Sequence, residues 1–316
     1  MTTSVSGPIG ILDEHPHWSG RLIAELESRR LPFEKIDHSS HGYDPRDRAR
    51  RYSVLVNRSS PSSHRRGHAA VLFYTEALLE HYAAIGVPVI NPVASYRFEK
   101  SKALQAGLFE RVGVRYPRTV VVNAPEQLVK AAGDFRCPVL VKPNVGGSGA
   151  LIERFDSVAD LEARADALDF GPDGTALLQQ YVEPLDGAIV RVEVLDGRFL
   201  YAIRIVRPAD DFNLCPADLC AAPTAAAPPP VLSGCGVSTL QVSSFEPPAA
   251  VIAQAVALAR AASIDIGGIE YLVGREDGRV YFYDVNATSN FVANAPDVLG
   301  FDPFLNFADY IIRRAG

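Results

Sequence analysis

The sequence has few of the features that mark secreted, membrane or nucleic-acid-binding proteins. Four cysteines in 316 residues, with no basic and apolar leader at the start, exclude a disulfide-rich scaffold and lead us to expect a cytoplasmic protein. No run approaches about 18 consecutive apolar residues, which excludes a membrane-spanning helix. Basic residues are also in the minority. With 31 Lys and Arg against 37 Asp and Glu, the formal charge is −6, so we expect no nucleic-acid partner.

The remaining composition is typical of a globular α/β protein. Apolar residues make up 47% and charged residues 22%, and the length suffices for two or three domains. Short β-branched runs alternate with amphipathic stretches. We expect residues 1–94 to form a small Rossmann-like domain of parallel strands, at 9–12, 33–37, 53–57 and 87–91, with helices at 18–30 and 68–85.

Two further units are predicted, at 95–180 and 181–316. The first has helices at 98–112 and 125–133 and from 157, with strands at 119–122, 139–142, 150–153 and 177–182. The second has hairpins at 189–206 and 268–286, each turning at an Asp-Gly pair, and helices at 248–263 and 303–314. The segment 207–248, which contains an Ala- and Pro-rich run, has no interpretable pattern.

A lysine and a glycine-rich loop follow one of these strands. Lys142 stands at the strand end and is followed by Pro143 and then by Gly146, Gly147, Ser148 and Gly149. Glycines let backbone N–H groups approach phosphate oxygens, and a lysine neutralises part of their charge. The lysine precedes the glycines, so the spacing is not that of a P-loop. A phosphate-binding loop and a plain glycine turn both fit this pattern.

The last hairpin places polar side chains in an apolar pattern. Asp284 and Asn286 are two residues apart and share one face of their strand, and Glu270 on the partner strand can face them. Their oxygens suit Mg²⁺ that also bridges phosphates, and an unpaired buried acid is costly. The alternative is a polar strand face without a ligand. The pattern favours metal ligands.

The order of these features resembles the ATP-grasp superfamily and, within it, the RimK-like carboxylate–amine ligases. The resemblance is strongest from residue 91 to 291 and implies two α+β lobes that hold ATP between them, preceded by the small parallel domain. It implies ATP as cosubstrate and two Mg²⁺ ions, with Mn²⁺ as an alternative. After Asn286, where relatives often have Ser-Pro-Gly, this chain reads Ala287-Thr288-Ser289.

The resemblance also implies roles for individual residues. Phosphate is expected at Lys102 and Lys142, under a lid of Gly146, Gly147, Ser148 and Gly149. Adenine is expected at the hinge formed by Gln179, Gln180, Tyr181 and Val182. The metal ligands are Glu270, Asp284 and Asn286, and the catalytic residues are Arg191, Arg204 and Asn286. The basic Arg204 and the later Asn213 also match substrate-side positions.

The predicted reaction joins a carboxylate to an amine through an acyl phosphate, with release of ADP and phosphate. Arg58 and Ser60 follow a strand of the first domain, where loops bind ligands, although a solvated loop is the alternative. A loop is favoured for His15, His17 and Trp18. The expected partners are a small carboxylate and an amine, or a peptide or protein terminus. The oligomeric state is left open, with a homo-oligomer as one alternative. A kinase or carboxylase on the same ATP site, and a silent ATP-binding scaffold, are the rival functions.

Overall fold

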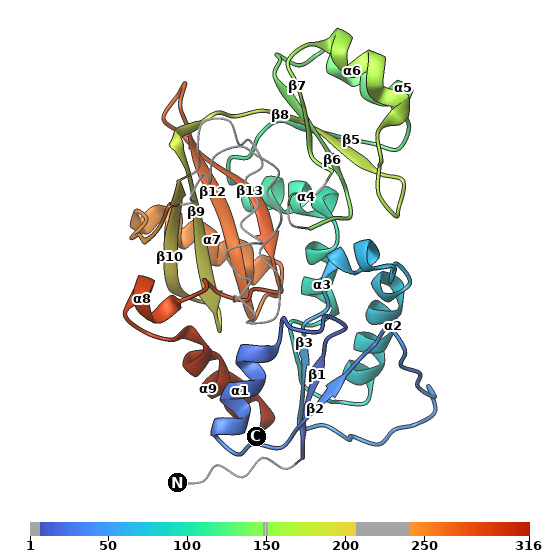
Figure 1. Ribbon diagram of the computed structural model, residues 1–316, viewed down its shortest axis with the longest axis vertical. Coiled ribbons are helices and arrows are strands. Elements are labelled where there is room, and N and C mark those ends of the chain that lie inside the picture. The colour runs from blue at the N-terminus through green and yellow to red at the C-terminus, as the bar shows by residue number, and fades with distance from the viewer. Residues whose placement is uncertain (1–6, 148, 150, 207–240) are drawn as a thin grey trace, which may run out of the picture.

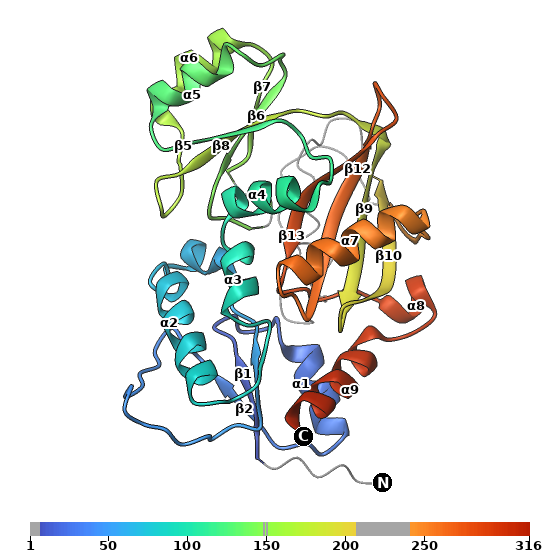
Figure 2. The same ribbon diagram turned by 180° about the vertical axis from the view of Figure 1, so that it is seen from behind.

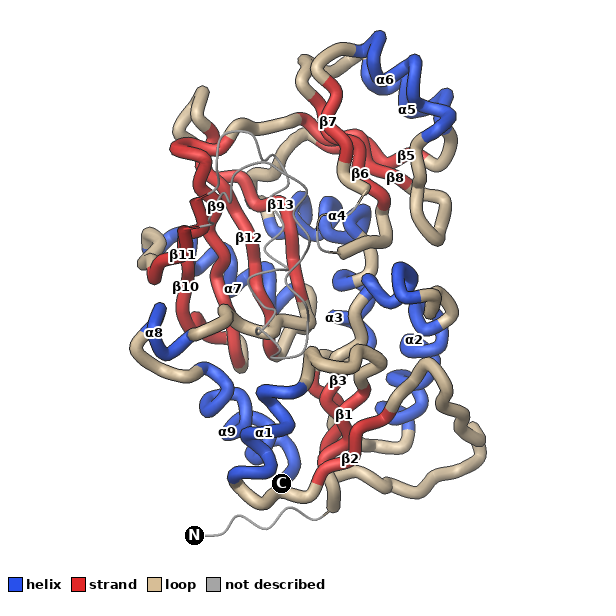
Figure 3. Tube along the Cα trace, viewed as in Figure 1, coloured by secondary structure: helices blue, strands red, loops and turns tan. Residues whose placement is uncertain are grey.

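The computed structural model describes residues 7–147, 149, 151–206 and 241–316. Within them the strands form three sheets, of four, five and four strands. In Figures 1 and 3 the sheet of the first domain lies at the lower right, the five-stranded sheet at the left and the remaining sheet at the top. No helix in the described ranges has the length and apolarity needed to cross a membrane.

The first sheet is parallel, as predicted, in the order β2-β1-β3-β4. Its strands are β1 (Ile9–Leu12), β2 (Phe33–Ile36), β3 (Val54–Asn57) and β4 (Val89–Ile90). Helix α2 (Val71–Ala84) packs on one face, and α1 (Gly20–Ser28) and the C-terminal α9 (Pro303–Ala315) pack on the other. Because both faces are covered, β1 and β3 are continuous apolar runs rather than alternating ones.

The connection to the second unit consists of two helices, so the predicted single helix at 98–112 is wrong. Helix α3 (Val93–Glu99) is followed by Lys100 as its C-cap, and a separate helix, α4 (Lys102–Val112), begins two residues later. The break lies at Ser101, whose extended backbone and side chain cap α4: its Oγ accepts a hydrogen bond from the Leu104 N–H at 3.2 Å. This places Lys102 in the first turn of a helix.

The second sheet is antiparallel, in the order β5-β8-β6-β7. Its strands are β5 (Thr119–Val122), β6 (Val139–Pro143), β7 (Glu153–Phe155) and β8 (Ala176–Gln180). The strand predicted at 150–153 begins only at Glu153. Helices α5 (Pro125–Ala132) and α6 (Val158–Arg164) cover one face, on which Val139 and Val141 are buried. The alternate residues of β6, Leu140 and Lys142, point to the other face.

The third sheet is antiparallel, in the order β11-β10-β9-β12-β13. It comprises β9 (Pro184–Leu195), β10 (Arg198–Val206), β11 (Gln241–Ser244), β12 (Ile266–Gly274) and β13 (Val280–Asn286), and it confirms both predicted hairpins. Helix α7 (Ala249–Ala261) crosses one face, as Figure 2 shows from behind. The sequence patterns missed strand β11, helix α8 (Ala295–Leu299) and the short 3₁₀ turns η1 (Pro61–Arg66) and η2 (Ala165–Ala167).

The first and third sheets are tied together by one buried asparagine. Asn91 follows β4, and its Oδ1 accepts the N–H groups of Asp265 and Ile266 at 2.9 and 3.1 Å. Its Nδ2 donates to the carbonyls of Ile266 and Ala287. One hydrophobic cluster also runs from β1 through α1 and α9 to β9 and β12. The predicted domain boundaries at 94 and 180 stay a prediction.

Candidate active site

In the part of the chain that the structure describes, a large cavity lies where the three sheets meet, and most of the predicted site residues line it. It encloses about 1370 Å³, the open space at its mouth included. The uncovered face of the second sheet forms one wall, and the face of the third sheet opposite α7 forms another. The predicted residues that line it are Ser60, Lys102, Lys142, Gly146, Gly147, Gly149, Gln179, Gln180, Tyr181, Val182, Arg191, Glu270, Asp284 and Asn286.

The third sheet presents three charged residues to this cavity in register. Across β9, β12 and β13, Arg191 pairs with Glu270, and Glu270 pairs with Asp284. Facing residues of adjacent antiparallel strands project to the same side. The alternation along each strand therefore collects these side chains on one face, while Val190 and Val192 project into the core under α7.

Two lysines reach the cavity from different elements. Lys102 is in the first turn of α4, and its Nζ lies 3.3 Å from Asp284 Oδ1. Lys142 stands near the end of β6, and its Nζ donates to Gln179 Oε1 at 2.6 Å. Both side chains are mostly buried, so their charges act in a region of low dielectric. Together they form a cationic wall suited to phosphate oxygens.

The segment after Lys142 is fastened to the start of α4. The Asn144 Oδ1 accepts hydrogen bonds from Ser101 Oγ and the Ala103 N–H, and its backbone carbonyl accepts one from the Lys102 N–H. This network joins the chain just after Lys142 to the backbone of Lys102. Gly146, Gly147 and Gly149 line the cavity, and a Cβ on Gly147 would be 3.4 Å from the Ser62 Cβ. Ser148 is outside the described residues.

The hinge residues 179–182 run from β8 toward β9 along the cavity. The N–H groups of Gln180 and Tyr181 donate to the carbonyls of Arg118 and Pro138. Gln179 is held by Lys142 and by the Thr119 hydroxyl, to which its Nε2 donates at 3.0 Å. A base bound here would therefore meet side chains and carbonyls of the hinge rather than those two N–H groups.

The metal-ligand candidates are brought together at the floor of the cavity. The Asn286 Nδ2 lies 3.1 Å from Asp284 Oδ2 and 3.4 Å from Glu270 Oε1. Rotating the Asn286 side-chain amide by about 180° would direct its Oδ1, instead of its Nδ2, toward Asp284 and Glu270. Across the described ranges no three His, Cys, Asp or Glu side chains group as a metal site. Two carboxylates and an amide nevertheless fit Mg²⁺, which keeps water and phosphate oxygens among its ligands.

The two carboxyl groups have opposite pKa shifts. Burial raises the pKa of Glu270 to about 7, against the attraction of Arg191 and with the support of the Asp284 charge. Burial also acts to raise the pKa of Asp284, but the neighbouring Lys102 and Lys142 outweigh it and lower that pKa. Asp284 is therefore the ionised partner of the lysines, whereas Arg191 does not offset the effect of burial on Glu270.

The structure does not bring all predicted residues to the cavity. Arg58 is buried and instead donates through Nη1 to the Ser289 carbonyl at 2.7 Å and through Nη2 to Asn290 Oδ1. Side chains of β10 alternate between the two faces of the sheet, and Arg204 pairs with Val190, which faces α7. Arg204 therefore projects to the α7 side of the sheet, where its Nη2 lies 3.8 Å from Asp186 Oδ2. Asn213 lies outside the described residues.

Several cavity residues were not predicted. Glu99, at the end of α3, accepts hydrogen bonds from the Ala287 N–H and the Thr288 hydroxyl, and burial raises its pKa. It thereby anchors the segment after β13, in which Thr288 and Asn290 line the cavity. Nothing in the helical pattern around Glu99 distinguishes it from a surface acid. Only the tertiary packing, which buries Glu99, makes this distinction.

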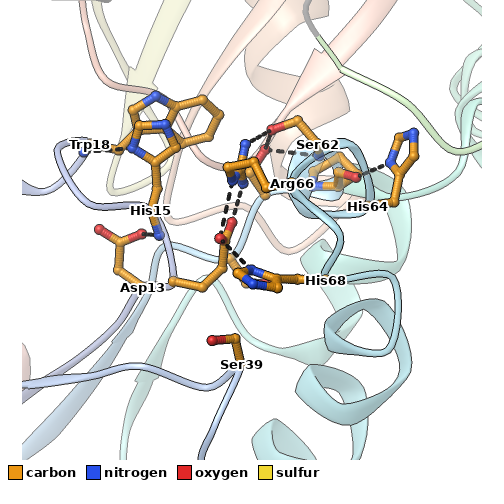
Figure 4. Close-up of polar contacts among 12 residues, drawn as sticks. Asp13, His15, Trp18, Ser39, Ser62, His64, Arg66 and His68 are labelled. Atoms are coloured by element: carbon orange, nitrogen blue, oxygen red, sulfur yellow. Dashed lines mark hydrogen bonds and ion pairs between the residues drawn. The ribbon is translucent and has the colours of Figure 1, made fainter.

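The first domain adds a polar cluster at the carboxyl ends of its strands. Trp18, for which a loop role was favoured, lines the cavity. Figure 4 shows Arg66 between Trp18 and His68, and its guanidinium lies 5.5 Å from the Trp18 ring centroid. Arg66 pairs with the buried Glu14, which also contacts His68 at 3.2 Å. The carboxyl ends of parallel strands meet at one edge of a sheet. Polar residues that follow these strands in the sequence are therefore the signal that could have predicted this cluster.

The chain is similar to known proteins in sequence and in fold. No family model matches the chain. It is 24% identical over 284 residues to a probable alpha-L-glutamate ligase 1 from Shewanella sp. (strain W3-18-1), across 84% of this chain and 82% of that protein. It is similar to the solved ATP-grasp ligase PsnB, with a TM-score of 0.69 and 19% identity over 99% of this chain and 100% of that one. The chain has the ATP-grasp fold.

A further solved structure has the same fold. A RimK domain protein from Sphaerobacter thermophilus DSM 20745 has a TM-score of 0.64 and 14% identity, over 98% of each chain. The predicted resemblance to the ATP-grasp superfamily and its RimK-like ligases is confirmed. The relatives are named as ligases, in agreement with the predicted class of enzyme.

Proposed function

We propose that this protein is an ATP-dependent carboxylate–amine ligase that forms an amide or peptide bond. The observation that carries the proposal is the convergence of Lys102, Lys142, Arg191, Glu270 and Asp284 on one cavity, from two sheets and a helix start. The ligase names of the relatives support it, and PsnB is complexed with Mg and ADP. These residues supply cations for phosphates and oxygen donors for a metal.

In this proposal, ATP lies between the second and third sheets. Lys102 and Lys142 hold phosphate oxygens, the hinge at 179–182 holds the adenine, and Gly146, Gly147 and Gly149 approach the phosphates from the mouth. Glu270, Asp284 and Asn286 hold Mg²⁺, with two ions, or Mn²⁺ in their place, as the finer proposal. Bound there, the metal supplies charge neutralisation at the phosphate oxygens.

The reaction has two steps. A substrate carboxylate oxygen attacks the γ-phosphorus of ATP, the bond to the β-phosphate oxygen breaks, and an acyl phosphate and ADP result. The amine nitrogen then attacks the acyl carbon, loses a proton and displaces inorganic phosphate. Arg191 and the two lysines stabilise the negative charge on the transferring oxygens, so the chain contributes positioning and electrostatics rather than a nucleophile.

The substrates are expected on the first-domain side of the cavity. Ser60 and Trp18 of the first domain line it, together with Asn290. The proposed partners are a small carboxylate and an amine, each an amino acid or a peptide, with a peptide or protein terminus as the larger alternative. We propose no role in substrate binding for Arg58, because its guanidinium bonds to the segment after β13.

The test is a paired screen of amino acids and dipeptides with ATP and Mg²⁺. ADP and inorganic phosphate are measured together, and mass spectrometry identifies the condensed product. A ligase releases phosphate only when both carboxylate and amine are present, and an Asp284→Ala variant serves as the inactive control. ADP formation together with a stable phosphorylated product would show a kinase instead. Failure to bind ATP with Mg²⁺ would refute the proposal.

A further inference from the structure

A second carboxylate lies beside Arg191 on β9, and no step of the proposed reaction uses it. Glu193 is two residues after Arg191 and therefore projects to the same face of the sheet. Across the next strand, Glu193 pairs with Gly268, as Arg191 pairs with Glu270. The Glu193 side chain is 1% exposed and does not line the cavity. A carboxylate buried so completely needs a reason.

The three nitrogens of the Arg191 guanidinium are bonded to three different side chains. Its Nε donates to Glu193 Oε1 at 2.6 Å, its Nη1 to Glu270 Oε1 at 2.8 Å, and its Nη2 to Ser289 Oγ at 3.2 Å. The Ser289 hydroxyl in turn donates to Glu193 Oε1 at 2.8 Å. The hydroxyl thus closes a ring with Arg191 and Glu193, and the ring fixes the plane of the guanidinium.

The backbone leaves room for this arrangement. A Cβ placed on Gly268 would overlap the Arg191 guanidinium. The guanidinium therefore occupies the space that a side chain at 268 would fill. Ser289 is held from the other side, where Arg58 of the first domain donates to its carbonyl at 2.7 Å. The hydrogen-bonded ring is thus held in place at Arg191 and at Ser289.

We propose that Glu193 and Ser289 are positioning residues, which divide the Arg191 guanidinium between two carboxylates and so keep Glu270 available to Mg²⁺. An arginine forms its strongest carboxylate pair by offering two parallel N–H groups. With its Nε edge held by Glu193, Arg191 cannot turn that edge to Glu270. Without the ring, Arg191 pairs more fully with Glu270 and competes with the cation. This inference rests on the proposed function.

The test measures how much Mg²⁺ the full-length protein needs to bind ADP, by titration calorimetry at a series of Mg²⁺ concentrations. Glu193→Gln weakens the pair with Arg191 by removing one charge. Ser289→Ala opens the ring without changing any charge, so it separates positioning from simple loss of negative potential. Asp265→Asn is the control, because Asp265 belongs to a partly buried ion pair with Arg314, away from the cavity.

Both site variants are expected to raise the Mg²⁺ concentration for half-maximal ADP binding, by on the order of fivefold in Glu193→Gln and somewhat less in Ser289→Ala. The ADP affinity at saturating Mg²⁺ should stay within about twofold of the wild type, and Asp265→Asn should keep the wild-type Mg²⁺ requirement even if it melts earlier.

Three results would overturn the inference: an unchanged Mg²⁺ requirement in Glu193→Gln, an unchanged requirement in Ser289→Ala, or an equal rise in Asp265→Asn. If Glu193→Gln does not fold, Ser289→Ala decides alone. A wild-type protein that binds no ADP with Mg²⁺ would refute the proposed function itself. Wild-type binding with unshifted variants would refute only the positioning role.

Discussion

Glu270 should make the metal-free protein less stable as the pH rises through neutrality, and Glu270→Gln should remove this effect. The folded protein holds the Glu270 proton more tightly than the unfolded chain does, because burial raises its pKa from 4.5 to about 7. Below the pKa of the unfolded chain, Glu270 is protonated in both the folded and the unfolded protein, so its burial carries no cost of ionisation. Between the two values the unfolded chain ionises first, so stability falls. Above about 7 the folded protein bears the full cost of a buried charge.

The size of the effect follows from the two pKa values. A difference from 4.5 to about 7 corresponds to about 3 kcal/mol in the free energy of unfolding. Between about pH 5 and pH 8 the expected loss is about 2.5 kcal/mol, because a small part has already occurred at the lower pH. Glutamine is neutral throughout and mimics the protonated acid. The stability of Glu270→Gln relative to the wild type should therefore rise by that amount.

The assay is urea unfolding of both proteins at the two pH values, in buffer with a chelator and without nucleotide. The other titrating groups are common to the two proteins, and Asp284, whose pKa is lowered by Lys102 and Lys142, is ionised at both pH values, so their contributions largely cancel in the difference. Glu183→Gln, in which an exposed glutamate is changed, is the matched control and should show no pH-dependent difference. A stability difference between Glu270→Gln and the wild type that stays constant from pH 5 to pH 8 would refute the reasoning.

Three further variants test the site and the fold. Lys142→Met should raise the KM for ATP by about thirtyfold, since a buried charged hydrogen-bond donor contributes about 2 kcal/mol, whereas the exposed Lys130→Met should leave it unchanged in steady-state kinetics. Asp284→Ala should lower kcat by at least about a hundredfold in a phosphate-release assay, and full turnover would sink its metal role. Asn91→Ala should cost about 3 kcal/mol in urea unfolding, because two buried N–H groups lose their acceptor, and a loss no larger than that of the exposed Asn123→Ala would contradict this.

Local patterns in the sequence predicted much of the architecture. The parallel first sheet, both hairpins and most helices follow from apolar periodicity and from turn residues such as Asp196-Gly197, which act over a few neighbours. Helix α4 shows the limit of this approach. The apolar pattern runs on through Ser101, and the break depends on a capping bond that periodicity does not register.

The sequence by itself determined which residues could share a face. Asp284 and Asn286 are two apart on one strand, and this spacing alone directs them to the same side. Lys142 at a strand end before glycines is likewise a local feature. Only the tertiary structure decided what these residues meet, because the pairing of β9 with β12 brings Arg191 beside Glu270 across 79 positions.

The same physical reason explains the residues that sequence reasoning misplaced or missed. Arg58 looks like a substrate ligand, but its partners Ser289 and Asn290 are more than 200 positions away. Arg204 is next to a residue of β10 that pairs with Arg191, and a shift of one residue in the register with β9 would turn it to the cavity side. Glu193 is an ordinary acid in an apolar strand until the fold encloses it. Local periodicity selects a face, whereas long-range register and packing decide what that face contacts.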